Sequence, residues 1–439
     1  MVPQDVCIPA GFGGNPIAFF DDYSWRAFIS LVWQAMPQTP SSSSSQRGMP
    51  DATKTIADNS GSLVFETYKA DWETFQPNGA TPSAFTSYTS TPPCPNAKPG
   101  DFVLGHATKF GNVGEAGVGN LVSVLVSQNG KFVRYLAAYN QTEFNRILSS
   151  QYYLASSLPQ NQTPVGPPIV FPNGSVDIKS SWIDMTGVAP QEQERFHTRN
   201  AWLQDPISGS CGTAPVLVGL VGLHIVQKTP TRPQWIWSTF EQIDNVPPPN
   251  YVPPTPPNLP AQTFTFNDGT NTGMPRFPPS NYLWSVAKGA SAPPAPINIV
   301  RQPGFPVNPS TVATNGTWQA ALKAANSVWQ FYALTMTQWP VPGSTPTNSG
   351  NPSSTFPGFN DNSAFANTTL ETWDQTNVRT GCMNCHTSIM SNDFLWSLQM
   401  NAFKPPSALA AAATGNTMRP LAEQPAIIQL RELLQNQMK

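Results

Sequence analysis

Four strand-like segments between residues 176 and 242 constrain the fold of this chain more than any other feature. They cover residues 176–185, 195–203, 215–227 and 234–242. The third segment falls within the longest apolar stretch of the sequence, Ala214 to Val226, which is typical of a buried strand. In the fourth, Trp235, Trp237, Thr239 and Glu241 alternate, so their side chains should share one face. The middle of the chain is therefore predicted to form a sheet.

Helical patterns flank this middle part. The first follows the capping residues Asp21 to Ser24, has apolar residues at helical spacing and ends at Pro37. Asn129-Gly130 predicts a hairpin between residues 121–126 and 131–138. Further helices are predicted over 63–75, 141–150, 318–329, 364–373, 393–402 and 424–438. The predicted fold class is α+β, with a strand-rich antiparallel centre, helices at the N-terminus and a helical C-terminal segment.

Two loop-like regions punctuate the second half of the chain. Residues 246–260 are dense in Pro, and residues 340–357 are rich in Gly, Pro, Ser and Asn. We therefore predict a mixed, strand-rich main domain over 1–345 and a helical segment over 346–439 that packs on it.

Charged residues make up only 11% of the chain, whereas about 25% is usual in globular proteins. A net charge of −2 gives no electrostatic basis for binding nucleic acid or an anionic membrane surface. No run of 18 apolar residues is present, so no membrane span is expected. Low charge combined with 48 Pro favours an extracytoplasmic protein with long loops.

The sequence Cys382-Met383-Asn384-Cys385-His386, called here the attachment motif, carries the clearest chemistry. Two thiols three residues apart can add to the two vinyl groups of haem, and the next His is then held under the iron. A structural zinc site would need a second pair of ligands, and a thioredoxin-like pair would need a βαβ context. Neither is evident, so we predict one covalent haem c, bound through Cys382 and Cys385, with His386 as the proximal ligand.

The region around the motif resembles the c-type cytochromes over at most the last 90 residues or so. Small soluble members carry the motif near the N-terminus and a distal Met several tens of residues later, whereas only 53 residues follow His386 here. Residues 219–226, 235–241 and 367–372 are similar to segments of large, mostly uncharacterised bacterial single-haem proteins with the motif near the C-terminus. That resemblance implies a single haem and no particular activity.

Covalent haem implies export, so we expect a periplasmic or secreted bacterial protein. Met1-Val2-Pro3 lacks signal-peptide features, and we expect that such a peptide was removed. Three Cys remain outside the motif. Cys7 and Cys94 lie in Pro-rich surroundings and form the favoured disulfide, whereas Cys211 opens an apolar strand and could be a buried thiol.

The sixth iron ligand is open at this stage. Of the other His residues, His224 lies in the most apolar strand and is either a core His bonded to a carbonyl or to Glu241, or a distal ligand or hydrogen-bond donor. His197, in a polar strand, is expected to be exposed. Met400 is a thioether candidate if the chain turns back, whereas Met390 is too close to His386 to reach the opposite side of the haem.

Glu241 is a second candidate catalytic residue besides His224. A carboxylate among aromatic rings has a raised pKa and could serve as a proton donor or base. The competing interpretation is a Glu at a strand end, paired with a cation such as Lys179 or Arg195.

Three functions are compatible with these observations. The first is an electron carrier that serves a redox partner protein, with two axial protein ligands. The second is a haem enzyme with an open distal site, acting on peroxide, oxygen, a nitrogen oxide or an organic substrate. The third is a binding or assembly protein in which the haem is a redox tag. Electron transfer is the favoured interpretation.

Overall fold

The structure is a computed structural model, and it describes most of the first 339 residues together with part of the C-terminal region. The described residues are 2–38, 46–104, 116, 125–162, 164–204, 210–253, 263–270, 296–301, 306–339, 366–373, 375, 382 and 386–405. Residues 366–405, as far as they are described, are called the C-terminal segment below.

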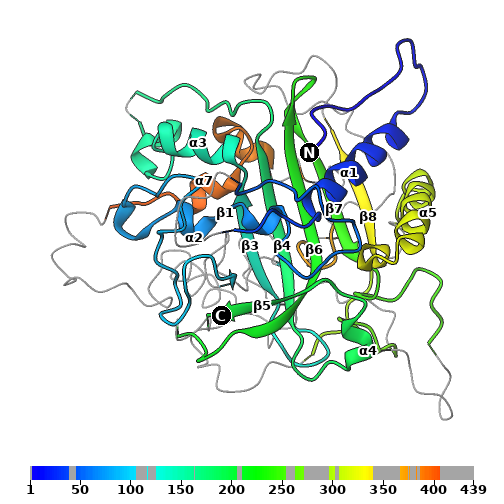
Figure 1. The fold of residues 1–439 in the computed structure, drawn as a ribbon. Helices are drawn as coiled ribbons and strands as arrows, with labels where there is room; N and C mark the ends of the chain where they lie inside the picture. The colour runs from blue at the N-terminus through cyan, green and yellow to red at the C-terminus, as the bar shows by residue number, and fades with distance from the viewer. Residues whose placement is uncertain are drawn as a thin grey trace, which may run out of the picture.

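A curled sheet of eight strands organises the described chain (Figure 1). The central strand is β6 (Val216–Thr229), which pairs with β4 along one edge and with β5 and β7 along the other. The strand order is β1-β3-β4-β6-β5-β2, and β8 extends the sheet beyond β7. The other strands are β1 (Lys69–Ala70), β2 (Val103–Leu104), β3 (Arg134–Tyr139), β4 (Val176–Asp184), β5 (Thr198–Leu203), β7 (Arg232–Gln242) and β8 (Tyr332–Gln338).

The predicted α+β class is confirmed, with one correction to the sheet. Its pairs are antiparallel except that β2 runs parallel to β5, so the sheet is mixed. The four strands predicted between residues 176 and 242 are all present, because their apolar alternation matches a buried sheet. The predicted turn at Asn129-Gly130 also forms, closed by a bridge between Val126 and Phe132, while residues 121–124 lie outside the described part.

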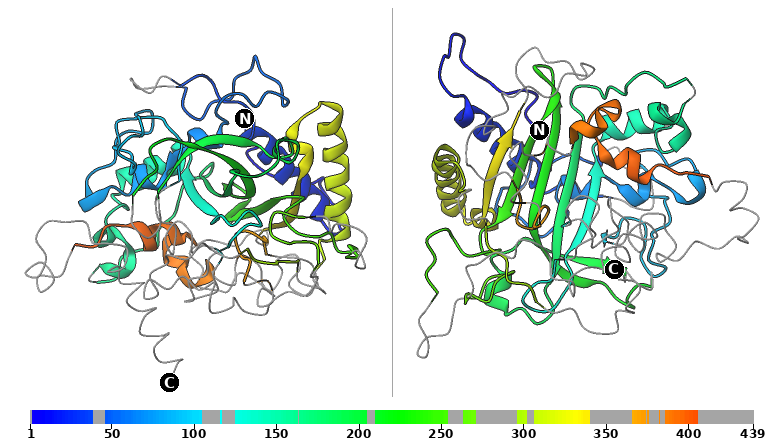
Figure 2. Two further views of the ribbon diagram at one scale, coloured as in Figure 1. Left: turned by 90° about the horizontal axis from the view of Figure 1, so that it is seen from below. Right: turned by 180° about the vertical axis from the view of Figure 1, so that it is seen from behind.

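Helix α1 and the C-terminal segment lie on opposite sides of the sheet. Figure 2 shows α1 on one side and the orange C-terminal segment on the other. Helix α5 packs against α1 and the edge strand β8. The helices are α1 (Ile17–Leu31), α2 (Asp71–Thr74), α3 (Gln141–Ser149), α4 (Pro190–Gln193), α5 (Pro309–Ala324) and α7 (Trp396–Asn401).

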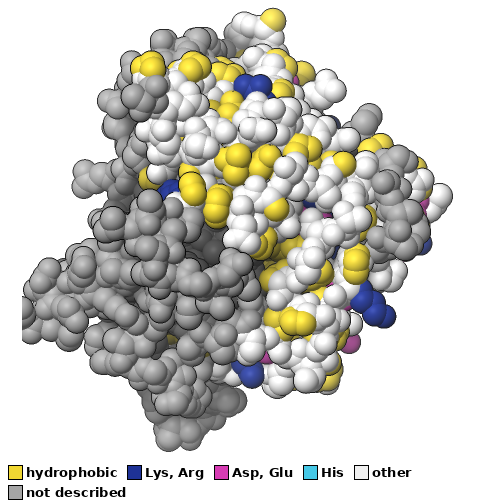
Figure 3. Space-filling model, turned by 90° about the vertical axis from the view of Figure 1, so that its left-hand side faces the viewer, with side chains coloured by type: hydrophobic (Ala, Val, Ile, Leu, Met, Phe, Trp, Pro, Cys, Tyr) yellow, Lys and Arg dark blue, Asp and Glu magenta, His cyan; other side chains and the backbone are white. Residues whose placement is uncertain are grey.

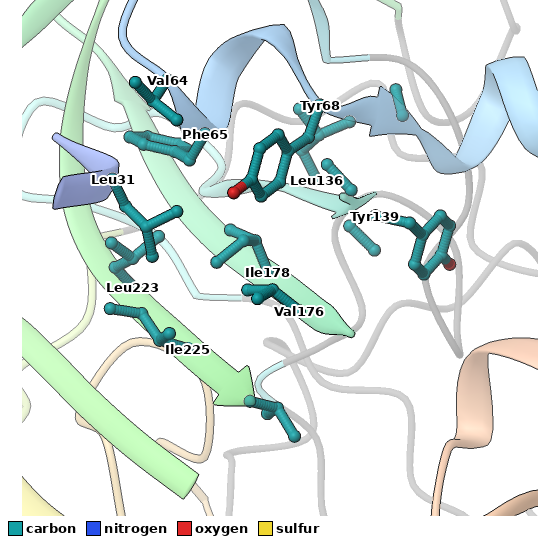
Figure 4. Packing of buried hydrophobic residues seen from close by; sticks show 14 of the residues in the cluster. Leu31, Val64, Phe65, Tyr68, Leu136, Tyr139, Val176, Ile178, Leu223 and Ile225 are labelled. Atoms are coloured by element: carbon teal, nitrogen blue, oxygen red, sulfur yellow. The ribbon is translucent and has the colours of Figure 1, made fainter. Parts of the chain in front are cut away.

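The side of the sheet covered by α1 is called the helix face, and it carries the main apolar core. Leu223 and Ile225 of β6 lie beside Val176 and Ile178 of β4 and under Leu31 of α1 (Figure 4). Aromatic rings fill the same layer, and the ring centroids of Phe28 and Phe240 are 4.3 Å apart. Burial of this apolar surface is the principal force that holds α1 on the sheet.

Several predicted helices differ in the structure. The pattern at 63–75 forms a short 3₁₀ turn, Phe65–Thr67, followed by β1 and α2, because Lys69 and Ala70 pair with β3. Helix α5 begins at Pro309, capped by the Asn308 side chain, and ends at Ala324, several residues before the predicted range ends. Strand β8 was not predicted. The helix predicted over 424–438 lies outside the described residues.

The described part of the C-terminal segment shares the main core. Phe394, Leu395, Leu398 and Ala402 belong to the same buried cluster as α1 and β6. The predicted division at residue 345 stays a prediction. Few charged side chains appear on the described surface in Figure 3, in keeping with the low charge of the sequence.

Candidate functional site

The second side of the sheet, called the segment face, is defined by Trp237, Thr239 and Glu241 of β7. As predicted, these residues and Trp235 point the same way, and each meets the C-terminal segment. The Trp235 Nε1–H donates to the Asp393 carbonyl at 3.1 Å, and the Trp237 ring lies 4.5 Å from the His386 ring, centroid to centroid. Thr239 Oγ1 accepts a hydrogen bond from Asn367, and Glu241 accepts one from Thr368. Strand β7 therefore contacts the segment at several points along its length.

Glu241 is the main anchor of residues 366–373. Its carboxylate accepts the Thr368 N–H at 2.8 Å and the Thr368 Oγ1–H at 2.7 Å. It also forms an ion pair with Arg301 at 2.8 Å and accepts a bond from Thr335. These contacts make Glu241 a structural carboxylate, paired with Arg301 instead of the predicted Lys179 or Arg195.

Further hydrogen bonds hold the same residues on the sheet. The Asn367 side chain donates to Thr239 Oγ1 at 3.0 Å and to the Phe240 carbonyl at 2.9 Å, and the Tyr135 hydroxyl donates to the Thr369 carbonyl at 2.9 Å. Gly222 of β6 permits the close approach, because an added Cβ would overlap Thr369. These residues form turns in place of the predicted helix over 364–373.

His386 has a defined orientation. Its Nδ1–H donates to the Phe394 carbonyl at 2.6 Å. This bond fixes the tautomer, since the carbonyl can only accept, and makes Nε2 the nitrogen with which the ring would bind a metal. Metal-binding His residues typically donate the other ring N–H to a carbonyl or carboxylate in this way. The position of His386 therefore fits a metal ligand.

Cys382 and His386 are both in helical conformation. Cys382 is half-buried and packs against Met336 of β8. Cys385 lies outside the described residues. The described part of the attachment motif therefore fits a haem held on the segment face through Cys382 and His386.

His224 also belongs to the segment face. It pairs with Thr239 on β7, which pairs with Met336 on β8, so these side chains lie in one row across three strands. Met336 contacts Cys382, which places His224 two strands from the attachment motif. The His224 Nε2 lies 3.4 Å from a Glu371 carboxylate oxygen, and the His224 side chain is 15% exposed. His224 is thus paired with Glu371, not with the predicted Glu241.

The other ligand candidates have different outcomes. Met400 is half-buried on α7, and its assignment as a distal ligand stays a prediction. His197 is 1% exposed, which contradicts the predicted exposure, because its Nε2 bonds Glu66 at 2.7 Å between Trp182 and Trp329. Burial alone raises the pKa of Glu66, but the charges of Arg199 and His197 lower it to about 2.

The predicted disulfide is wrong. Cys94 bonds Cys211, with their Cα atoms 5.4 Å apart, and Cys7 is an exposed free thiol. Cys211 lies next to Pro93, close to Cys94, and is therefore bonded instead of being a buried thiol. Sequence spacing alone could not choose among the three possible pairs.

A buried ion pair that was not predicted lies next to His386. Lys228 at the end of β6 pairs with Asp393, and both side chains are almost completely buried. Burial raises the pKa of Asp393 and lowers that of Lys228. The only sequence signal was Lys228 at the end of an apolar strand, a position that commonly faces solvent.

Buried carboxyls surround this ion pair. Burial raises the pKa of Glu143 well above its usual value, and the charges of Asp177 and Asp393 add to the effect. Burial also raises the pKa of Asp177 to about 7, although Lys179 and Ser397 lower it. The interior around the Lys228–Asp393 ion pair therefore contains carboxyls whose pKa is raised by burial.

The described ranges contain no further candidate metal site and no candidate membrane span. No group of three or more His, Cys, Asp or Glu side chains there could hold a metal ion, and no helix there is long and apolar enough to cross a bilayer. The chain matches no protein-family model, no curated protein and no solved structure.

Proposed function

We propose that this chain is a c-type cytochrome with one covalent haem c, bound through Cys382 and Cys385 with His386 as an iron ligand, and that it transfers electrons. The observation that supports this most is the Nδ1–H bond from His386 to the Phe394 carbonyl, at 2.6 Å, beside a half-buried Cys382. It gives the His of the attachment motif the orientation of a metal ligand. A His with only a structural role would have no need of two correctly spaced Cys.

The chain's own residues would keep the site rigid. When bound, haem iron takes up and releases one electron. Glu241 and Asn367 fix residues 366–373 on β7, and Trp237 packs against the His386 ring. A rigid ligand environment lowers the structural rearrangement that accompanies a change in charge. This favours an electron-transfer role with a redox partner protein, and haem attachment favours a periplasmic or secreted location in a bacterium.

A second candidate function is a haem enzyme with an open distal site, and His224 is the observation that favours it. His224 lies on the segment face, in the cross-strand row that includes Met336, and remains partly exposed. A carboxylate oxygen of Glu371 lies 3.4 Å from the His224 Nε2. Such a pair could donate a proton to peroxide, oxygen, a nitrogen oxide or an organic substrate.

An absorption spectrum with and without carbon monoxide distinguishes the two functions. The protein should be matured in a host that attaches haem c and exports it. An electron carrier should show a six-coordinate ferrous spectrum that carbon monoxide changes only slowly. Rapid binding of carbon monoxide would contradict the carrier and favour the enzyme, in which case His224→Ala should alter the spectrum of the bound complex.

The distal ligand can be tested with two Met variants. If Met400 binds the iron, Met400→Leu should abolish the Met-to-iron charge-transfer band of the ferric protein and open the site to carbon monoxide. Met390→Leu is the matched control, because Met390 follows His386 too closely to reach the opposite side of the haem. Loss of the band in both variants would exclude a specific role for Met400.

A further inference from the structure

The chain turns sharply at Asp393 and Phe394, just before α7. Both residues have positive φ, +54° at Asp393 and +70° at Phe394. Two adjacent residues other than Gly rarely adopt this conformation, and for a bulky residue such as Phe it is strained. The carbonyl of Phe394 is the group that accepts the His386 Nδ1–H. The strained turn therefore presents a backbone acceptor that fixes the orientation of the His386 ring.

Contacts from three different parts of the chain hold this turn. The Asp393 carboxylate pairs with Lys228 of β6 and accepts the Phe171 N–H at 2.7 Å. The Asp393 carbonyl accepts the Trp235 Nε1–H of β7 at 3.1 Å. The Phe394 ring is fully buried in the main core. Strain of this kind persists only where the surroundings over-determine the conformation, and these contacts do so.

Stability alone does not account for the ion pair. Removing two charges from water costs as much as their attraction returns, so apolar residues of similar volume would stabilise an interior at least as well. The position of the ion pair offers another explanation, because Asp393 directly precedes Phe394, whose carbonyl orients His386.

We propose that Lys228, Asp393 and Trp235 are positioning residues that lock the Phe394 carbonyl onto the His386 Nδ1–H and thereby set the donor strength of the imidazole toward iron. This inference rests on the proposed function of His386 as a haem ligand. A carbonyl that accepts the Nδ1–H makes the ring a stronger donor, which stabilises ferric iron and lowers the reduction potential. Loosening the turn should weaken that bond and raise the potential.

The test combines two measurements on Lys228→Met. The variant leaves the Asp393 carboxylate buried without its cation, so the turn should loosen. The exchange of the His386 Nδ1 proton with solvent deuterium, followed by NMR, should become roughly tenfold faster or more, and the reduction potential should rise. Adding Asp393→Asn should restore both values toward those of the wild type, because Asn tolerates positive φ and its amide oxygen can still accept the Phe171 N–H.

A second variant and a control keep the test decisive. Trp235→Phe removes the N–H donor and keeps an aromatic ring, so it should change both measurements in the same direction, by less. Glu73→Gln disrupts another buried ion pair, with Arg47, and should leave both unchanged. Unchanged proton exchange and potential in Lys228→Met and Trp235→Phe would overturn the proposal, as would an equal change in Glu73→Gln.

Failure of the proposed function would look different. Wild-type protein without haem after maturation would contradict the cytochrome assignment. The exchange of the His386 ring proton can be measured with or without haem, so it tests the positioning role by itself.

Discussion

The two faces of the sheet are covered through different kinds of interaction. The helix face is covered by α1 mainly through large apolar side chains, among them Phe28, Leu223 and Phe240, with a few buried hydrogen bonds such as that between Ser24 and Ser238. The segment face holds the described residues between 366 and 394 through hydrogen bonds and ion pairs, led by Glu241 and by Lys228, in addition to apolar contacts such as those of Phe394. Apolar burial supplies most of the stability, whereas directional polar contacts fix positions. We infer that the first face keeps the protein folded and the second places the attachment motif.

The largest expected effect comes from the helix face. Phe28→Ala should lower the free energy of unfolding by about 3–5 kcal/mol, because it leaves a cavity beside Phe240 and Trp329. Urea unfolding followed by fluorescence measures this change. The exposed Val312→Ala is the control and should alter stability by about 0.5 kcal/mol at most. The haem spectrum of the folded variant should match that of the wild type. A changed spectrum would contradict the inference that the helix face does not position the attachment motif.

On the segment face, Glu241→Ala should cost about 2–4 kcal/mol, since it leaves Arg301 without its carboxylate and the Thr368 N–H without an acceptor. Residues 366–373 should become accessible to protease in the folded protein, which limited proteolysis with mass spectrometry detects. The exposed Glu192→Ala on α4 is the matched control. If the protease cuts the Glu241→Ala variant no faster than the control variant, the polar contacts do not hold the segment.

Gly222→Ala tests how closely the segment approaches the sheet. The new methyl group would overlap Thr369 and Ser181, so the variant should lose about 1–3 kcal/mol and shift the absorption spectrum. In the control, Gly316→Ala on α5, the added Cβ meets nothing within 4 Å, and the variant should gain about 0.5–1 kcal/mol. Equal effects of the two substitutions would argue against tight packing at Gly222.

The smallest expected effect concerns pH. Burial raises the pKa of Asp177 from its ordinary 3.8 to about 7, so the folded protein retains a proton that the unfolded chain releases between these values. Stability should therefore fall as pH rises through this window, and Asp177→Asn should remove much of that fall. Urea unfolding at pH 4.5 and at pH 7.5 measures the slope. Asp22→Asn, which alters an exposed ion pair with Arg26, is the control and should leave the slope of stability against pH unchanged. An unchanged slope in Asp177→Asn would contradict the assignment.

The sequence predicted the sheet centre better than the rest of the fold. Alternation in residues 234–242 gave the shared face of Trp235, Trp237, Thr239 and Glu241, because side-chain direction in a strand depends on local geometry alone. Helix patterns were less reliable. Lys69 and Ala70 join the sheet through β3, which is a distant pairing that no local pattern records.

The candidate site was predictable only in part. The spacing of Cys382, Cys385 and His386 is visible in the sequence because the chemistry requires it. The Lys228–Asp393 ion pair and the Cys94–Cys211 disulfide join residues more than 100 positions apart, and their partners are set by the folded topology. The same holds for Glu371, which became the partner of His224.

The most direct test of the central claim is the intact mass of the protein under denaturing conditions. The protein should be produced in a host that exports it and attaches haem c, and acid and organic solvent should be used to strip any haem that is not covalently bound. We predict the mass of the chain plus one haem in the wild type, and the mass of the chain alone once Cys382 and Cys385 are both replaced by Ser. A wild-type mass equal to that of the chain alone would contradict the assignment.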